Sequence, residues 1–501
     1  MSHGVNSIFV EPDDLALVVS GRVAVGERFA GVFASANADG STLIRALLAG
    51  HGSMEAICSE LAPGVDRYPA LTPMVPCAAW YEREIYDLFG VEPVGHLNLE
   101  PLVLPLGPNE SWRPRPGVER TGEVHRPALD VKALARRVTG QGMFTIPYGP
   151  VRSGVFESVE YLVETFGEDI ACVISRVHYK HRGIEQRFCD LEPADGVLLA
   201  ERVEGAASVA HAVAYCQALE DIAGCEIPHR SALVRVVHAE LERVSNHLDS
   251  VARNAEAAGQ AVANARMTLH KERVQRLRSR LCGHRFGRGV VVPGGVSGSL
   301  LVEPEKVLAV LGALEGSIAD DASSLMSTPS FLDRLRHTGR ISPEVAASHG
   351  ALGPVGRGSA FACDVRSERP YGAYGLLGFE PAMASAPGDA LARQQVRLEE
   401  ITTAFHLIRE ALDELGEQRA EAEWRVRVAP PEGIGISSVE APQGELIYII
   451  EAAGGRLLRV KQRSASFHNL ALFPQAFGGD ILTDFAFIEA SFGISLAGVA
   501  G

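Results

Sequence analysis

The chain has 501 residues, which is more than one ordinary domain requires and suggests at least two domains. Its 46% hydrophobic and 22% charged residues permit a large core and exclude an intrinsically disordered chain. The formal net charge of −15 argues against nonspecific nucleic-acid binding, because such binding requires a basic surface that displaces counterions.

The first part of the chain predicts a small α/β domain at residues 1–106. The expected elements are strands at residues 15–25 and 29–36 and helices at residues 41–48 and 74–88, the last ended by Gly90. The next segment contains four prolines with polar residues between them. We therefore expect a linker at residues 107–129.

The remaining residues, 130–501, predict a large domain with a helical centre. Its expected elements are strands at residues 144–147 and 158–164, helices at 198–222, 228–258, 270–282 and 304–326, and a β-rich tail at 433–460 with a strand at 445–451 and a hairpin turn at 453–456. Long helices that are apolar on more than one face indicate a buried bundle. The predicted fold class is α+β, a small α/β domain followed by a helical-bundle domain with peripheral β-sheets.

Cysteine spacing and hydrophobic run length indicate a cytoplasmic protein. No two of the eight cysteines are separated by two residues, which argues against zinc ribbons, iron–sulfur loops and thioredoxin-type sites. Reduced, mostly buried thiols are the expectation. No run approaches the roughly 20 apolar residues that span a bilayer, and no signal peptide is recognisable. Any attachment to a membrane is therefore expected to come through partners.

The string WYEREIYDLFG at residues 80–90 resembles the signature of the thirty-kilodalton subunit of complex I. On a helix, Arg83, Glu84 and Asp87 would lie on neighbouring faces, with Trp80 and Phe89 turned inward. A solvated charged side and a docking face for a neighbouring subunit both fit this pattern. The order of the residues favours the docking face.

Further motifs extend this resemblance in the same order along the chain. They are IPYGPVRSGVFE at 146–157, GEDI at 167–170, YKHRGIE at 179–185, ELERVSNHL at 240–248, PGGV at 293–296 and CDVRSERPY at 363–371. They are similar to motifs of nickel–iron hydrogenase large subunits and of the 49-kDa subunit of complex I. The resemblance implies a hydrogenase-large-subunit-like fold, fused to a complex I 30-kDa-like domain.

The resemblance also implies roles for individual residues. His181, Arg182 and His247 are expected to face an iron–sulfur cluster in a small partner subunit, whose potential the positive Arg182 and a titrating His181 would raise. Glu185 is a candidate proton relay, and Arg366 is the candidate catalytic residue that faces the active-site cavity. A surface turn with local charge pairs, and for His247 a core histidine bonded to a backbone carbonyl, remain the alternatives.

The ligands of a nickel–iron centre are missing at the positions that we assign to them. Active hydrogenases hold the two metals with two Cys-x-x-Cys pairs. The first pair corresponds to Glu204 and Ala207, and we assign the second to Ser491 and Ile494. None of these side chains replaces a thiolate, so we expect no metal site, no nickel–iron centre and no hydrogen chemistry. Glu204 is retained as a candidate catalytic carboxylate.

Quinone and nicotinamide are expected only as substrates of a whole complex. In the complex I family a histidine and a tyrosine hold the quinone head group, and the matching positions here are Phe156 and Gly205, which cannot donate those hydrogen bonds. The segment GPVGRG at 353–358 has a proline in the wrong place for a dinucleotide-binding loop. This chain therefore gives little sign of holding NAD itself.

Together these observations predict a subunit of a membrane-associated respiratory oxidoreductase complex of the NADH dehydrogenase or energy-converting hydrogenase type. It would transfer electrons beside the iron–sulfur cluster of a small subunit and lie on the inner face of the cell membrane through membrane-arm subunits. The alternative is a non-catalytic structural subunit that bridges the iron–sulfur subunit and the membrane arm.

Overall fold

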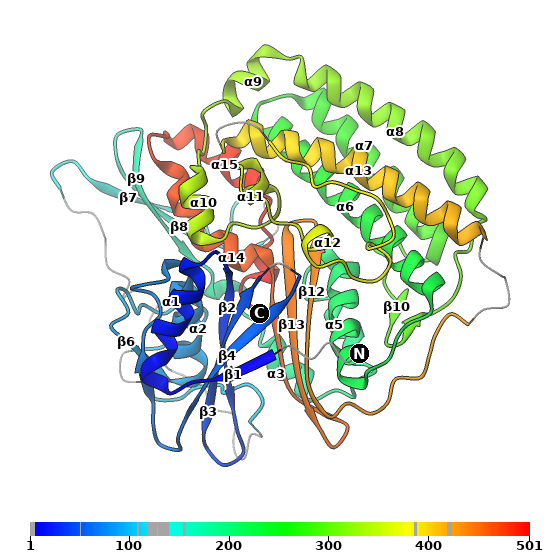
Figure 1. Ribbon diagram of the computed structural model, residues 1–501. Coiled ribbons are helices and arrows are strands. Elements are labelled where there is room, and N and C mark those ends of the chain that lie inside the picture. The colour runs from blue at the N-terminus through cyan, green and yellow to red at the C-terminus, as the bar shows by residue number, and fades with distance from the viewer. Residues whose placement is uncertain are drawn as a thin grey trace.

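The computed structural model describes residues 6–50, 52–107, 110–118, 128, 140–153, 157–384, 388–417 and 423–501. The chain has an N-terminal sheet with two helices, a helical middle and an antiparallel sheet near the C-terminus, which confirms the predicted α+β class (Figure 1). The C-terminal sheet lies between the N-terminal sheet and the long helices and contacts both (Figure 1).

The N-terminal sheet has four strands in the order β1-β4-β3-β2. Strand β1 is parallel to β4, and the other neighbours are antiparallel. Helix α1 packs on β3 and β4, and helix α2 packs on β2. The elements of this part are β1 (Asn6–Phe9), α1 (Leu15–Ala24), β2 (Arg28–Ala36), β3 (Thr42–Ala49), β4 (Met54–Leu61), α2 (Ala79–Phe89) and a short parallel pair, β5 (Arg67–Pro69) and β6 (Glu92–Val94).

Two predicted elements of this part are wrong. Residues 15–25 form helix α1 instead of a strand, because the buried Leu15, Ala16 and Val19 follow helical spacing. Residues 41–48 form strand β3 instead of a helix, because β3 pairs with β2 and β4 and is buried on both faces. A short continuous apolar run has no period that distinguishes the two structures.

Helix α2 turns its carboxylates into the protein. Glu82 is fully buried and accepts hydrogen bonds from the backbone N–H groups of residues 71 and 72 at 2.7 and 3.0 Å. Asp87 accepts from the N–H groups of residues 102 and 103 at 2.7 and 2.8 Å. Burial raises the pKa of Asp87 to about 6, even though these donors favour its charged form.

The remaining carboxylate of this helix binds a distant part of the same chain. Glu84 accepts a hydrogen bond of 2.7 Å from the ammonium group of Lys461 in the C-terminal sheet. Gly90 ends the helix with a positive φ of 75°, as predicted. Neither a solvated face nor a docking face for another subunit is correct for residues 80–90. Their charges hold the N-terminal part to its own chain.

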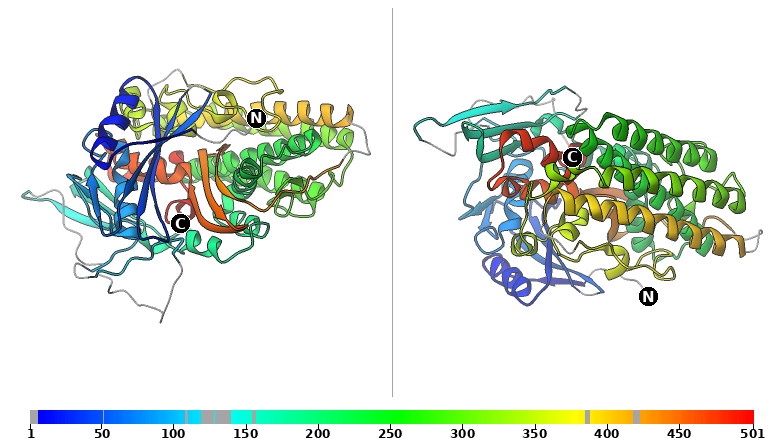
Figure 2. Two further views of the ribbon diagram at one scale, coloured as in Figure 1. Left: turned by 60° about the horizontal axis from the view of Figure 1, so that its bottom comes forward. Right: turned by 90° about the horizontal axis from the view of Figure 1, so that it is seen from above.

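The helical middle is built around α6, which packs against α7 and α13, while α8 packs against α7 and α13 (Figure 2). The helices are α3 (Ile184–Cys189), α4 (Gly196–Ala200), α5 (Ser208–Ala223), α6 (His229–Ala257), α7 (Ala261–Cys282), α8 (Pro304–Met326), α9 (Pro329–Leu335), α10 (Pro343–His349), α11 (Gly353–Gly358), α12 (Val365–Glu368) and α13 (Ala390–Glu417). The predicted helices at 228–258 and 304–326 are confirmed, whereas residues 198–222 are interrupted between α4 and α5.

Among the described residues, no helix combines the length and apolar character needed to cross a membrane.

Two three-stranded antiparallel sheets complete the fold, in the orders β7-β8-β9 and β12-β13-β14. The elements are β7 (Phe144–Tyr148), β8 (Glu160–Phe166), β9 (Asp169–Arg176), the short pair β10 (Val291–Val292) and β11 (Gly295–Val296), β12 (Gly433–Ala441), β13 (Gly444–Ala453), β14 (Arg456–Arg463), α14 (Ala465–Leu472) and α15 (Phe485–Phe492). The expected strands and the hairpin turn at 453–456 are confirmed. The predicted linker lies largely outside the described residues, so the domain boundaries remain predictions.

We expect Asp87→Ala to destabilise the protein, because it leaves the buried N–H groups of Leu102 and Val103 without an acceptor. Each buried unsatisfied group costs about 1–3 kcal/mol, so the loss should be at least about 2 kcal/mol. The midpoint of urea unfolding measures it. Asp66→Ala, whose side chain is exposed, is the control. Equal losses in the two variants would contradict this role of Asp87.

Candidate functional site

The candidate site is centred on Glu204, where the chain enters helix α5. Glu204 is 2% exposed, and its Oε2 lies 3.3 Å from Nε2 of His211. The Nδ1 of the same ring lies 2.8 Å from the hydroxyl of Tyr448 on β13. The other oxygen of Glu204, Oε1, is buried and has no hydrogen-bond partner among the described residues. A carboxylate, an imidazole and a phenol thus form a buried row along which a proton can move.

The C-terminal segment closes over this carboxylate at Gly498. A Cβ atom on Gly498 would overlap Oε2 of Glu204 and would lie 2.7 Å from Oγ of Ser464. The hydroxyl of Ser464 donates a 3.0 Å hydrogen bond to the carbonyl of Gly498 and holds the two segments together. The carboxylate of Glu204 therefore occupies the space that a side chain at position 498 would need.

This contact corrects our assignment of the second ligand pair. Ser491 is fully buried and accepts a 3.0 Å hydrogen bond from Arg393, whereas Ile494 packs, partly buried, against the core beside the N-terminal sheet. The segment that faces Glu204 is 495–498, whose first and last residues have the Cys-x-x-Cys spacing. The sequence near the C-terminus is apolar and offers no charged residue that fixes this register.

Glu157 fixes the same segment from the other side. Its carboxylate accepts hydrogen bonds of 3.2 Å from the hydroxyl of Ser495 and from the backbone N–H of Ala497, and a further bond from the N–H of Leu496. The backbone N–H of Ser495 also donates a 3.1 Å hydrogen bond to the hydroxyl of Ser466. The C-terminal segment is therefore held rigidly against the site.

His181 and Arg182 also belong to this site. The guanidinium of Arg182 donates hydrogen bonds to the carbonyls of Val203 at 2.6 Å and Ala497 at 2.9 Å, and so joins both sides of the site. Nδ1 of His181 donates to the carbonyl of Ala500 at 2.6 Å. Burial lowers the pKa of His181, so the ring is neutral near pH 7. This environment does not support the expectation of a titrating His181.

Glu185 is an ion-pair partner. Its carboxylate accepts a 2.7 Å hydrogen bond from Lys461 and binds Arg459, both on β14. Burial alone would raise its pKa, but the two cations outweigh burial and lower the pKa to about 2. A carboxylate that stays ionised at every physiological pH does not relay protons, so the proton-relay prediction for Glu185 is not supported by its environment.

Arg366 is bonded to carboxylates on two sides. It donates to Asp364 at 2.8 Å and to Glu240 at 3.1 Å, and its guanidinium carbon lies 4.6 Å from the centre of the Phe379 ring. The residue is 1% exposed. These contacts place Arg366 inside a charged network and not at an open cavity.

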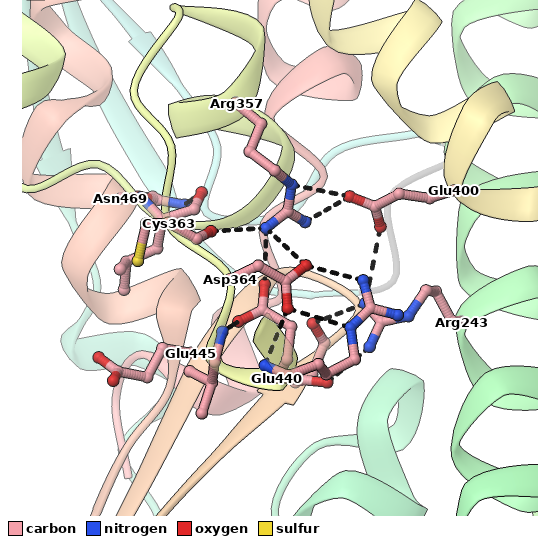
Figure 3. A network of polar contacts seen from close by, with 12 residues as sticks. Arg243, Arg357, Cys363, Asp364, Glu400, Glu440, Glu445 and Asn469 are labelled. Atoms are coloured by element: carbon pink, nitrogen blue, oxygen red, sulfur yellow. Dashed lines mark hydrogen bonds and ion pairs between the residues drawn. The ribbon is translucent and has the colours of Figure 1, made fainter. Parts of the chain in front are cut away.

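This network, which we call the arginine cluster, joins α6, α11, α12, α13 and β12 (Figure 3). Its members are Arg243, Arg357, Arg366, Glu240, Asp364, Glu400 and Glu440. Sequence reasoning missed most of it. One signal was available, because Glu240, Arg243 and His247 recur at helical spacing on an otherwise buried helix.

His247 belongs to the arginine cluster and not to a surface. Its Nε2 donates a 2.7 Å hydrogen bond to Glu400, and the residue is fully buried. Burial lowers its pKa to about 4, although the carboxylate favours the charged ring. The structure thus places it where no partner subunit can reach it. It bonds a carboxylate, and not the backbone carbonyl that the alternative expected.

The described residues do not form a metal site around Glu204. No group of three or more His, Cys, Asp or Glu side chains among them is arranged to hold a metal ion. Ala207 is fully buried in the apolar core of the helical part. Of the two positions matched to quinone ligands, Gly205 is exposed, and Phe156 lies outside the described residues.

Comparison with known proteins gives consistent matches along the chain. The profile of the respiratory-chain NADH dehydrogenase 49 Kd subunit matches residues 258–432 and 422–500, and that of the 30 Kd subunit matches residues 45–116. The carbon monoxide-induced hydrogenase of Rhodospirillum rubrum is 32% identical over 70% of this chain and 96% of its own length. The membrane-bound hydrogenase subunit alpha of Pyrococcus furiosus is 28% identical over 69% and 84%, and an NADH-quinone oxidoreductase subunit of Methylacidiphilum infernorum is 30% identical over 75% and 95%.

We expect Gly498→Ala to push Glu204 away from His211 and to loosen the C-terminal segment, at a cost of about 1–3 kcal/mol. Adding Glu204→Ala should recover much of this loss, because it removes the overlapping carboxylate. A double-mutant cycle by urea unfolding measures the coupling. Gly478→Ala, where a Cβ meets no neighbouring atom, is the control. Strictly additive losses would show that the two residues do not compete for space.

Proposed function

Because the chain belongs to the family of complex I 49-kDa subunits and nickel–iron hydrogenase large subunits, with a complex I 30-kDa-type domain at its N-terminal side, we propose that it is the large subunit of an oxidoreductase complex without a nickel–iron centre. In this proposal it supports electron transfer at an iron–sulfur cluster of the small partner subunit. Glu204, with His211 and Tyr448, supplies the proton-handling groups next to that cluster.

The observation that carries this proposal is the fit between Glu204 and Gly498. Nickel–iron sites require four soft thiolates, and the facing positions hold Glu204, Ala207, Ser495 and Gly498. The carboxylate of Glu204 fills the side-chain space at position 498, so a ligand there would collide with it. The residues present do not fit the metal pair, and no step of the proposed reaction passes through it.

The chemistry left to this chain is proton transfer and positioning. Oε1 of Glu204 has no partner among the described residues and can receive a proton, which His211 and Tyr448 can pass on through their hydrogen bonds. Arg182 places a fixed positive charge beside the same segment. A nearby positive charge favours the reduced state of an acceptor, and a proton relay favours its coupled protonation.

The partners in this proposal are an iron–sulfur small subunit and the membrane-arm subunits of a complex I-like or group 4 hydrogenase-like assembly. The chain would lie on the cytoplasmic face of the cell membrane, held there by those subunits. The membrane-bound hydrogenase of P. furiosus, which this chain resembles, supports this placement. NAD or quinone would be a substrate of the whole complex and not a ligand of this chain.

A non-catalytic bridging subunit is the second candidate, and one observation favours it. Arg366 and Glu185 have their polar groups engaged with other side chains of the same chain, and Nε2 of His247 bonds Glu400. Such pairing is also what a purely structural scaffold would need. The two candidate functions differ only in whether Glu204, His211 and Tyr448 transfer protons during electron transfer by the complex.

The absence of nickel is tested on the purified complex. We expect elemental analysis to find iron from the partner subunit and no stoichiometric nickel, and hydrogen uptake and evolution assays to show no turnover. The physical reason is the lack of thiolates around Glu204. One nickel per chain, or hydrogen turnover by the complex, would overturn the proposal.

The role of Glu204 is tested by Glu204→Gln, which keeps the shape of the side chain and removes the acidic group. If the row relays protons, electron transfer by the complex should slow by about a hundredfold, with a changed pH profile. Glu192→Gln, at an exposed carboxylate, is the matched control. Unchanged turnover and pH profile in Glu204→Gln would favour the bridging subunit.

A further inference from the structure

The arginine cluster contains one more carboxyl group than guanidinium groups. Three arginines face Glu240, Asp364, Glu400 and Glu440, and all seven side chains are at most 1% exposed (Figure 3). Arg397, the next cation on α13, donates to the carbonyls of Arg393 and Phe492 instead. Because water cannot screen a buried charge, the unmatched carboxyl carries a large desolvation cost when it is ionised.

Glu440 is the unmatched carboxyl. It shares one nitrogen of Arg357, Nη1, with Asp364, at 3.0 Å and 3.2 Å respectively. Its second oxygen accepts only the backbone N–H of Val365 at 3.1 Å among the described residues. Asp364 has a further cation of its own, since Arg366 donates to it at 2.8 Å. Two carboxyls that meet on one nitrogen are not both ionised at low cost.

The charge balance agrees with this geometry. Burial, and then the neighbouring Asp364, raise the pKa of Glu440 to about 7. The pKa values of Glu240, Asp364 and Glu400 are lowered, because the cations outweigh the cost of burial. The same environment therefore favours a proton on Glu440 over its three neighbouring carboxyls.

A narrow cavity is lined both by Glu440 and by residues exposed at the surface. Its volume is about 20 Å³, enough for one water molecule. Its outer wall includes the exposed Gly372 and the partly exposed Gln217, and its inner wall includes the buried Tyr374 and Glu440. The remaining lining is largely apolar and comes from helices α5 and α6. Tyr371, whose hydroxyl accepts a 3.0 Å hydrogen bond from the N–H of Glu440, lies on the same wall.

We propose that Glu440 is an exchangeable proton-binding site, shared with Asp364, and that this cavity conducts the proton between Glu440 and solvent. A hydronium ion or a buffer acid gives up the proton, so its own bond to hydrogen breaks as the O–H bond on a carboxylate oxygen of Glu440 forms. Binding of this proton changes the net charge of the arginine cluster by one unit. The change occurs where the cluster joins β12 to the surrounding helices. This inference does not depend on the proposed electron-transfer role.

The charged and titratable groups that face Glu440 define its pH dependence. They are Arg243, whose guanidinium donates to the Glu440 carbonyl at 2.7 Å, and Arg357, Arg366, Asp364 and Tyr371. Arg235, also in the cavity wall, is neutralised by Glu220 at 2.6 Å. The pKa of Glu440 lies above its ordinary value of 4.5, so folding takes up a proton between about pH 4.5 and about pH 7. Stability from this group is present below that range and is lost as the pH rises through it.

The test is infrared difference spectroscopy of the full-length chain, alone or in the complex with which it purifies. Between about pH 6 and about pH 8, the carbonyl absorption of protonated carboxylic acids in the wild-type chain should fall, with Glu440 as the main contributor beside Asp87 and Asp480, whose pKa values are about 6. Glu440→Gln should lose the Glu440 contribution to this band, and its urea midpoint should fall less than that of wild type as the pH rises to about 7. Glu399→Gln, an exposed carboxylate on α13, should keep the band. A full-size band in Glu440→Gln would overturn the proposal.

A second variant tests the route and does not depend on the folding of Glu440→Gln. Ala239 lines the cavity and is not a member of the arginine cluster, so Ala239→Leu narrows the cavity and keeps every charge of the cluster. We expect the carbonyl band of Glu440 to remain. After transfer to D₂O, the rate at which this band shifts, which reports exchange of the proton for deuterium, should fall at least tenfold. Exchange at the wild-type rate would show that the proton does not pass through this cavity, and absence of the band from wild type would refute the site itself.

Discussion

The interior of this protein depends on pairing most of its buried cations with carboxylates, many of them from distant parts of the chain. Removing a charge from water costs several kcal/mol, so each segment is stable only when its partners are in place. The β12–β14 sheet supplies many of these partners. Glu440 binds Arg357, and Glu445 binds Arg28 of the N-terminal sheet at 2.8 Å. The two halves of the chain are therefore coupled through one sheet.

The sequence predicted those parts of the fold in which a hydrophobic pattern repeats over a long segment or in which a known motif occurs. Residues 228–258 and 304–326 are long enough for helical spacing to exclude a strand, whereas residues 41–48 are not. For the site, the Glu-Arg-Val string at residues 201–203, which resembles the string that precedes the first cysteine pair in the family, set the position of Glu204. The partners of Glu185 lie on β14, more than 270 residues later, and no local pattern reveals a pairing of that kind. The same limit concealed the contact between Glu204 and Gly498.

Three buried carboxylates show how environment sets the use of one functional group. Glu185 lies between two cations and stays ionised. Glu440 shares one guanidinium nitrogen with a second carboxyl and therefore holds a proton more readily. Glu204 has one oxygen next to an imidazole and one without a partner among the described residues. Within one scaffold, the first is suited to holding segments together, and the other two are suited to moving protons.

The attachment of helix α2 to the C-terminal sheet has a consequence for how the chain can be divided. Besides Glu84 and Lys461, Arg45 pairs with Glu451 at 2.7 Å, and Tyr81 bonds His468 at 2.7 Å. These contacts exclude water, so salt screens them weakly. Two separately synthesised polypeptides, one ending before β7 and the other beginning there, would carry complementary partners at these contacts, and salt would weaken the buried pairs between them only slightly. In the intact chain, the peptide backbone keeps the two parts at a one-to-one ratio, while the buried pairs fix their orientation.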